Sequence, residues 1–170
     1  MTRGPQKNVG ASVRDRLTQR ARAAGENVQL ILTRYAIERL LYRLSISSHS
    51  DKFVLKGAML FSLWSPTPYR ATGDLDLLGM GDPAATALIA AFRDVQQVDA
   101  ADDGVTFAPD SLRAELTRPQ DEYAGVRVLF DAMIAGARLP IQVDVGFGDA
   151  VTPAPGRSNI RRFSGCRRRS

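Results

Sequence analysis

Two aspartates, Asp74 and Asp76, stand two positions apart in a segment of alternating polar and apolar residues. Side chains at positions i and i+2 of a β-strand project from the same face of the sheet, so both carboxylates can share one cation. Hard divalent cations such as Mg²⁺ prefer such oxygen ligands. The pattern suits nucleotidyl transfer, in which two Mg²⁺ ions about 3.5–4 Å apart neutralise a triphosphate and the attacking oxygen. An Asp-x-Asp pair alone is also common on solvated strand faces.

A third carboxylate, Asp144, lies in another alternating segment, where Val143 and Val145 oppose it on the other face. If the two strands are neighbours, Asp144 joins the first two aspartates. Three acids crowded in this way repel one another, so the arrangement makes sense only with a compensating cation. We therefore take Asp74, Asp76 and Asp144 as candidate catalytic and metal-binding residues.

Candidate nucleotide-binding residues precede the aspartates: they are Lys56, Gly57, Ala58, Arg70 and Thr72. Residues 54–58 read as a strand, a glycine turn and the start of a helix, which places backbone N–H groups where they can hold a phosphate. Lys56 adds a point charge at the same place. Arg70 and Thr72 are further side chains able to reach a phosphate.

The elements that must position these residues follow from periodicity. Apolar residues at helical spacing predict a helix over residues 12–24, capped by Ser12, and a second over 27–44. In the second helix we expect Arg34, Arg39 and Arg43 on a solvated face. A helical run is expected over 58–64, and Asp82 is expected to cap a helix over 83–97.

Strand patterns cover residues 53–55, 71–79, 104–107, 112–117, 123–134 and 139–147. Gly136 and Pro140 mark a turn between the last two, which predicts a hairpin. The order of elements indicates an α+β fold with a mixed sheet, preceded by two N-terminal helices. We divide the chain into an N-terminal helical segment (1–50), a core (51–150) and an irregular basic tail (151–170).

The composition excludes several other functions. The 170 residues contain one histidine, His49, and one cysteine, Cys166, so multi-histidine zinc sites, histidine triads and internal disulfides are excluded. No apolar run approaches the roughly 20 residues of a membrane span, and no secretory leader is visible, so we expect a cytoplasmic protein without membrane contact. The net charge of +5 comes from six arginines between Arg157 and Ser170. This tail either binds RNA phosphates or is a solvent-exposed terminal segment without a function.

The candidate residues also carry a resemblance to a known family. Its three pieces are Leu55-Lys56-Gly57-Ala58, Arg70-x-Thr72-x-Asp74-Leu75-Asp76-Leu77, and Gln142-Val143-Asp144-Val145-Gly146-Phe147-Gly148-Asp149. In this order they resemble the AbiEii family of bacterial abortive-infection and toxin–antitoxin nucleotidyltransferases, which belong to the DNA polymerase β-like superfamily. The resemblance extends from about Arg34 to Gly148.

The resemblance implies Mg²⁺-dependent transfer of a nucleotide from a nucleoside triphosphate to an acceptor, which for such toxins is the 3′ end of tRNA. It also implies a cognate antitoxin. Gly57, with Lys56 and Ala58, would contact the triphosphate. Asp74 and Asp76 would hold two metal ions, and Asp144 would complete the site and orient the attacking hydroxyl.

Two departures from the family pattern leave alternatives open. Relatives often have Gly-Ser where this sequence has Gly57-Ala58. They also continue into a helical region with a lysine-bearing helix and a further aspartate, so we expect a C-terminally truncated enzyme whose activity is in question. The alternatives are an inactive remnant that keeps the fold, and an enzyme that modifies a small-molecule hydroxyl, such as that of an aminoglycoside.

Overall fold

The computed structural model describes residues 8–60, 73–117 and 125–148. Within these residues the chain forms helices and strands in the order α1 (Val9–Ala24), α2 (Val28–Ser45), β1 (Phe53–Lys56), β2 (Asp74–Gly79), α4 (Ala85–Gln96), β3 (Thr106–Leu116), β4 (Val126–Ile134) and β5 (Ala137–Gly146). Residues 58–60 are also helical, and the residues that follow them lie outside the described ranges. The expected helical run over 58–64 therefore lies mostly outside the described residues.

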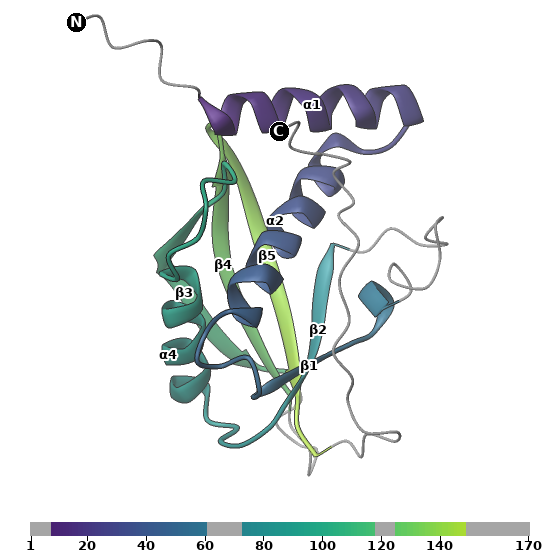
Figure 1. Cartoon of the computed structure of the whole chain (residues 1–170). Coiled ribbons are helices and arrows are strands. Elements are labelled where there is room, and N and C mark those ends of the chain that lie inside the picture. The colour runs from purple at the N-terminus through teal and green to yellow at the C-terminus, as the bar shows by residue number, and fades with distance from the viewer. Residues whose placement is uncertain (1–7, 61–72, 118–124, 149–170) are drawn as a thin grey trace, which may run out of the picture.

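The five described strands form one mixed sheet in the order β1-β2-β5-β4-β3. β2 and β5 run parallel, whereas the other neighbouring strands are antiparallel. Helices α2 and α4 lie against one face of the sheet, and α1 crosses one end of it (Figure 1). The prediction of an α+β fold with a mixed sheet, preceded in the sequence by two N-terminal helices, is confirmed.

The core lies between this sheet face and the helices. Alternate residues of the central strands are buried, among them Leu75, Val128 and Val143, which are at most 1% exposed. They pack with Ile37 and Leu40 of α2 in a single hydrophobic cluster. The strand residues between them point to the opposite face, which carries the candidate carboxylates. None of the helices in the described ranges is long and apolar enough to cross a membrane.

Asparagines begin both N-terminal helices. The side chain of Asn8 accepts a hydrogen bond from the Ala11 amide at 2.9 Å, and that of Asn27 accepts one from the Leu30 amide at 3.0 Å. The expected cap at Ser12 is therefore wrong, because Asn8 starts α1 earlier. The expected cap at Asp82 is wrong as well. Its carboxylate accepts from the Ala84 amide in the turn before α4.

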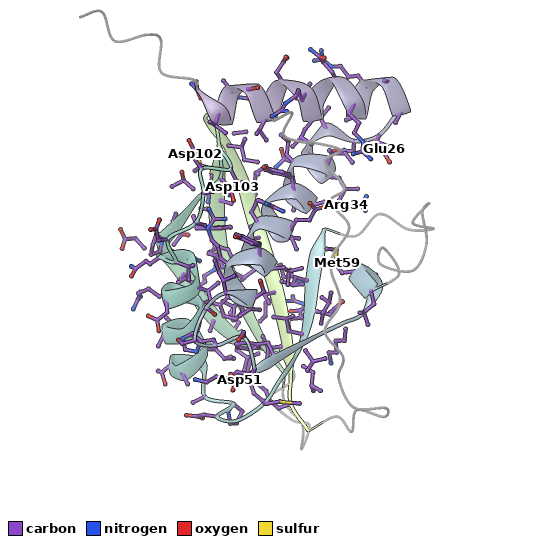
Figure 2. All side chains as sticks on the ribbon, in the orientation of Figure 1. Glu26, Arg34, Asp51, Met59, Asp102 and Asp103 are labelled. Atoms are coloured by element: carbon purple, nitrogen blue, oxygen red, sulfur yellow. The ribbon has the colours of Figure 1, made fainter. Side chains whose placement is uncertain are left out.

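The arginines of α2 do not form a solvated face, contrary to the prediction. Arg34 and Arg43 are buried, at 6% and 7% exposure. The guanidinium of Arg43 pairs with both carboxylate oxygens of Asp103 and lies 5.1 Å from the ring centroid of Phe107. Figure 2 shows Asp103 in the loop beside α2, so this pair fastens that loop to the helix.

Two strand boundaries also differ from the prediction. The segments expected near 104–107 and 112–117 form one strand, β3, whose pairing with β4 shifts between Ala108 and Arg113. This irregularity interrupts the hydrophobic alternation from which separate strands were predicted. The expected hairpin is present, with its turn at Ala135 and Gly136. Pro140 lies inside β5 rather than in the turn.

Candidate functional site

The three candidate aspartates lie on the parallel pair of strands. Asp76 of β2 is the register partner of Asp144 of β5, and Asp74 is the partner of Gln142. Their apolar neighbours Leu75 and Val143 are buried toward the helices. Because side chains alternate along a strand, the aspartates share the face that α2 and α4 leave open. The fold thus brings Asp144 beside Asp74 and Asp76, which lie far from it in the sequence.

Lys56 and Gly57 lie on the other side of β2. Lys56, the last residue of β1, is the register partner of Asp76. Gly57 has a φ of +73°, a conformation that favours glycine. A Cβ atom at this position would collide with the Asp76 carboxylate, because it would lie 2.8 Å from Cγ. The absence of a side chain therefore lets the backbone of the β1 turn lie directly against the central acid.

The helix that follows this turn is fixed to the core. The amide of Leu60 donates to the Gly57 carbonyl at 3.1 Å, which forms the first helical turn. Met59 is 2% exposed and belongs to the hydrophobic cluster. Ala58 is the first residue of this helix. The other two candidate nucleotide-binding residues, Arg70 and Thr72, lie outside the described residues.

The surroundings of Asp76 disfavour its charged form. Burial raises the pKa of its carboxyl, and the negative charges of Asp144 and Asp74 raise it further, whereas Lys56 opposes the shift. Both effects disfavour the ionised form. The site therefore concentrates more negative charge around Asp76 than Lys56 compensates, and a bound cation would relieve this repulsion.

Asp144 is held by two neighbouring side chains. Arg127 of β4 donates from Nε to Oδ1 at 2.8 Å and from Nη2 to Oδ2 at 3.2 Å. Gln142 donates from Nε2 to Oδ2 at 2.9 Å. The hydrogen bond to Asp144 raises the pKa of the Arg127 guanidinium. Both oxygens of the third carboxylate are thus engaged.

Sequence reasoning missed Arg127 and Gln142. A signal for Arg127 was present, because the turn at Ala135 and Gly136 pairs Ile134 with Ala137 and thereby fixes the register. Counting outward in equal steps from this turn places Arg127 opposite Asp144. Gln142 stands two positions before Asp144 and therefore shares its face.

The donor set fits a hard divalent cation, because three carboxylates share one face and repel one another. In the ranges 8–60, 73–117 and 125–148, however, no three Asp, Glu, His or Cys side chains already converge as metal ligands. The engagement of both Asp144 oxygens by Arg127 and Gln142 is consistent with this. Asp74, Asp76 and Asp144 are the residues that would hold the ion.

A mixed α+β sheet that brings three acids beside a glycine turn is the arrangement expected of a polymerase β-like nucleotidyltransferase. Residues 39–166, more than half of the chain, match the family described as "Nucleotidyl transferase AbiEii toxin, Type IV TA system". The chain belongs to this family, as the resemblance in its sequence predicted.

Solved structures to which the chain is similar include a protein assigned as a nucleotidyltransferase from H. pylori, with a TM-score of 0.46 and 13% identity over 75% of this chain and 49% of that one. JHP933 from Helicobacter pylori has a TM-score of 0.45 and 12% identity over 75% of this chain and 47% of that one. The chain thus spans about half the length of these structures. No curated protein matches the sequence.

Proposed function

We propose that this protein transfers a nucleotide from a nucleoside triphosphate to an RNA acceptor, namely the 3′ end of tRNA, in the presence of Mg²⁺. The observation that carries the proposal is the register of β2 and β5, which pairs Asp76 with Asp144 on the open face of the sheet. Membership of the AbiEii family supports nucleotidyl transfer as the reaction. The tRNA acceptor rests on the family resemblance.

In this proposal each group has a separate task. Asp74 and Asp76 hold the divalent cations, which supply charge neutralisation at the triphosphate and at the attacking oxygen. Asp144 completes the site and orients the acceptor hydroxyl. The ammonium of Lys56 and the backbone at Gly57 and Ala58 bind the triphosphate next to the aspartates.

The glycine turn supports this division of tasks. Gly57 lies against the Asp76 carboxylate without an intervening side chain. A phosphate bound at the backbone of this turn would therefore be within reach of cations held by Asp74 and Asp76. We propose Arg70 and Thr72 as further phosphate contacts, on the basis of their positions just before Asp74 in the sequence.

The family description also names a toxin–antitoxin system, so we propose that a cognate antitoxin restrains this activity in the cell. Nucleoside triphosphates and tRNA are abundant in the cytoplasm, where we place the reaction.

The test is an incubation of purified protein with Mg²⁺, each radiolabelled nucleoside triphosphate and total tRNA. We expect label to appear in the RNA with the wild type and to be absent with Asp74→Ala/Asp76→Ala. The control is Asp131→Asn, which removes another acid near the open face and one that pairs with Arg138, away from the carboxylate cluster. This control should keep activity.

The other outcomes separate the alternatives. Label that reaches an aminoglycoside but not tRNA would show a small-molecule acceptor. No transfer to either acceptor by folded protein would overturn the proposed activity and indicate an inactive remnant with the same fold.

A further inference from the structure

The ion pair between Arg127 and Asp144 uses the carboxylate that the proposed function needs as a third metal ligand. The guanidinium donates hydrogen bonds to both carboxylate oxygens, at 2.8 Å to Oδ1 and 3.2 Å to Oδ2. Gln142 adds a hydrogen bond to Oδ2 at 2.9 Å. Each oxygen therefore already accepts at least one hydrogen bond from a neighbouring side chain.

A divalent cation at Asp144 would compete with Arg127 for two reasons. The cation needs lone pairs of the same oxygens, and it would be repelled by the positive guanidinium beside it. Two parallel hydrogen bonds make the arginine a strong competitor. The ion pair and a fully assembled metal site are thus alternative states of one carboxylate.

Arg127 has room to change partners. Its side chain is 39% exposed and that of Asp144 is 28% exposed, so the pair lies at the surface of the open face rather than in the core. The alternating neighbours Val126 and Val128 are buried on the opposite face and keep β4 in place. The guanidinium can therefore swing away without disrupting the packing of the sheet.

We propose that Arg127 neutralises and positions the Asp144 carboxylate in the metal-free protein. When a divalent cation binds, Arg127 releases this carboxylate to the cation. This inference rests on the proposed function, because it takes Asp144 as a metal ligand. It assigns Arg127 as a positioning residue that weakens cation binding in the nucleotide-free protein.

The first test is a Mn²⁺ titration, followed by calorimetry, of nucleotide-free protein. Arg127→Met keeps the length of the side chain and removes its charge. It should bind Mn²⁺ roughly tenfold more tightly, because repulsion falls and the two hydrogen bonds from the guanidinium to Asp144 are lost. The matched control is Arg138→Met. Arg138 forms the corresponding β5–β4 ion pair with Asp131, at 2.8 Å, and its removal should change the affinity less than about twofold.

A second measurement is made on the wild-type protein, and a variant serves only to assign one signal. The Nε–H of Arg127 donates to Asp144, and the Nε–H of Arg138 donates to Asp131, both at 2.8 Å. In nitrogen–proton NMR spectra, Mg²⁺ should shift or broaden the Arg127 signal and leave the Arg138 signal in place. Arg127 is assigned by the loss of its signal in Arg127→Met.

The outcomes distinguish this inference from the function on which it rests. If Mn²⁺ binding is lost in Asp76→Asn but is equal or weaker in Arg127→Met, the exchange is overturned and the metal site stands. An Arg127 signal unchanged at saturating Mg²⁺ overturns the exchange in the same way. If neither the wild type nor Arg127→Met binds Mn²⁺, the metal site of the proposed function fails as well.

Discussion

At the scale of single residues, Gly57 carries two constraints at once. Its φ of +73° costs any other residue conformational energy. A Cβ atom there would also meet the Asp76 carboxylate. Gly136 has a similar φ, +80°, but open space where its Cβ would lie. A substitution at Gly136 would therefore cause backbone strain alone, whereas one at Gly57 would add a collision in the candidate site.

We expect Gly57→Ala to reduce the transfer activity more than about tenfold, because the methyl group displaces the Asp76 carboxylate. Gly136→Ala should lose only about 1 kcal/mol of stability and keep its activity. The measurements are urea unfolding and the radiolabel assay on both variants. Equal activities of the two variants would show that the close approach of Gly57 to Asp76 has no role.

The residue types of the candidate site were largely predictable, but the ion pair of one of them requires the strand register as well. The two-residue period of a strand predicts that Asp74 and Asp76 share a face, which the structure shows. The ion pair of Asp144 with Arg127 depends on which strands are neighbours and in which register. Local periodicity does not contain that information. The position of the hairpin turn does, but the prediction placed Pro140 in the turn, so Arg127 was missed.

At the scale of elements, the loop before β3 is fastened to α2 by a buried ion pair. Arg43 and Asp103 have side chains that are only 9% and 10% exposed. The Asp103 carboxylate also accepts from the Val105 amide at 3.1 Å, and its carbonyl accepts from the Tyr35 hydroxyl at 2.8 Å. Several bonds therefore converge on Asp103 and fix the path of the chain between α4 and β3.

We expect Arg43→Met to lower the free energy of unfolding by about 3 kcal/mol, because it leaves the Asp103 charge buried without its partner. Arg113→Met is the control: Arg113 lies 3.7 Å from Glu115, and both side chains are more than half exposed. That variant should change stability by less than about 0.5 kcal/mol. Urea denaturation measures both. Equal losses would contradict a structural role of the buried pair.

Helix α2 was predicted correctly, but the burial of its arginines was not. The ion pair between Arg43 and Asp103 is the reason for the error. Periodic apolar residues reveal α2, whose bounds Val28–Ser45 agree closely with the predicted 27–44. Whether an arginine on that helix meets water depends on the loop that crosses it, and Asp103 lies 60 positions further along the chain. Sequence periodicity alone therefore could not place Arg43 inside.

At the scale of the whole molecule, the crowded acids make stability depend on pH. The folded protein raises the pKa of Asp76 above its ordinary 3.8, mainly by burial and then by the charge of Asp144. In the pH window just above 3.8 the folded state therefore binds more protons than the unfolded state. This contribution favours the fold at low pH and is lost as the pH rises through the folded-state pKa.

Asp76→Asn should consequently be more stable than the wild type at pH 7 in metal-free buffer, by less than about 1 kcal/mol because the group is only partly buried and solvent screens it. The advantage should shrink as the pH falls toward the ordinary pKa of 3.8. Thermal unfolding between pH 3.5 and about 8 measures this. A variant less stable than the wild type at pH 7 would refute the charge-crowding argument.

The parallel contact between β2 and β5 also has a consequence for biosynthesis. It joins an antiparallel pair, β1 and β2, to an antiparallel block of β3, β4 and β5. A ribosome makes the chain from its N-terminus at about 5–20 residues per second, so the strand with Asp144 emerges last of the five. Nascent chains that already expose Asp74 and Asp76 still lack the third acid. The complete acid cluster thus forms only after the C-terminal strand of the sheet has been synthesised and inserted between β2 and β4.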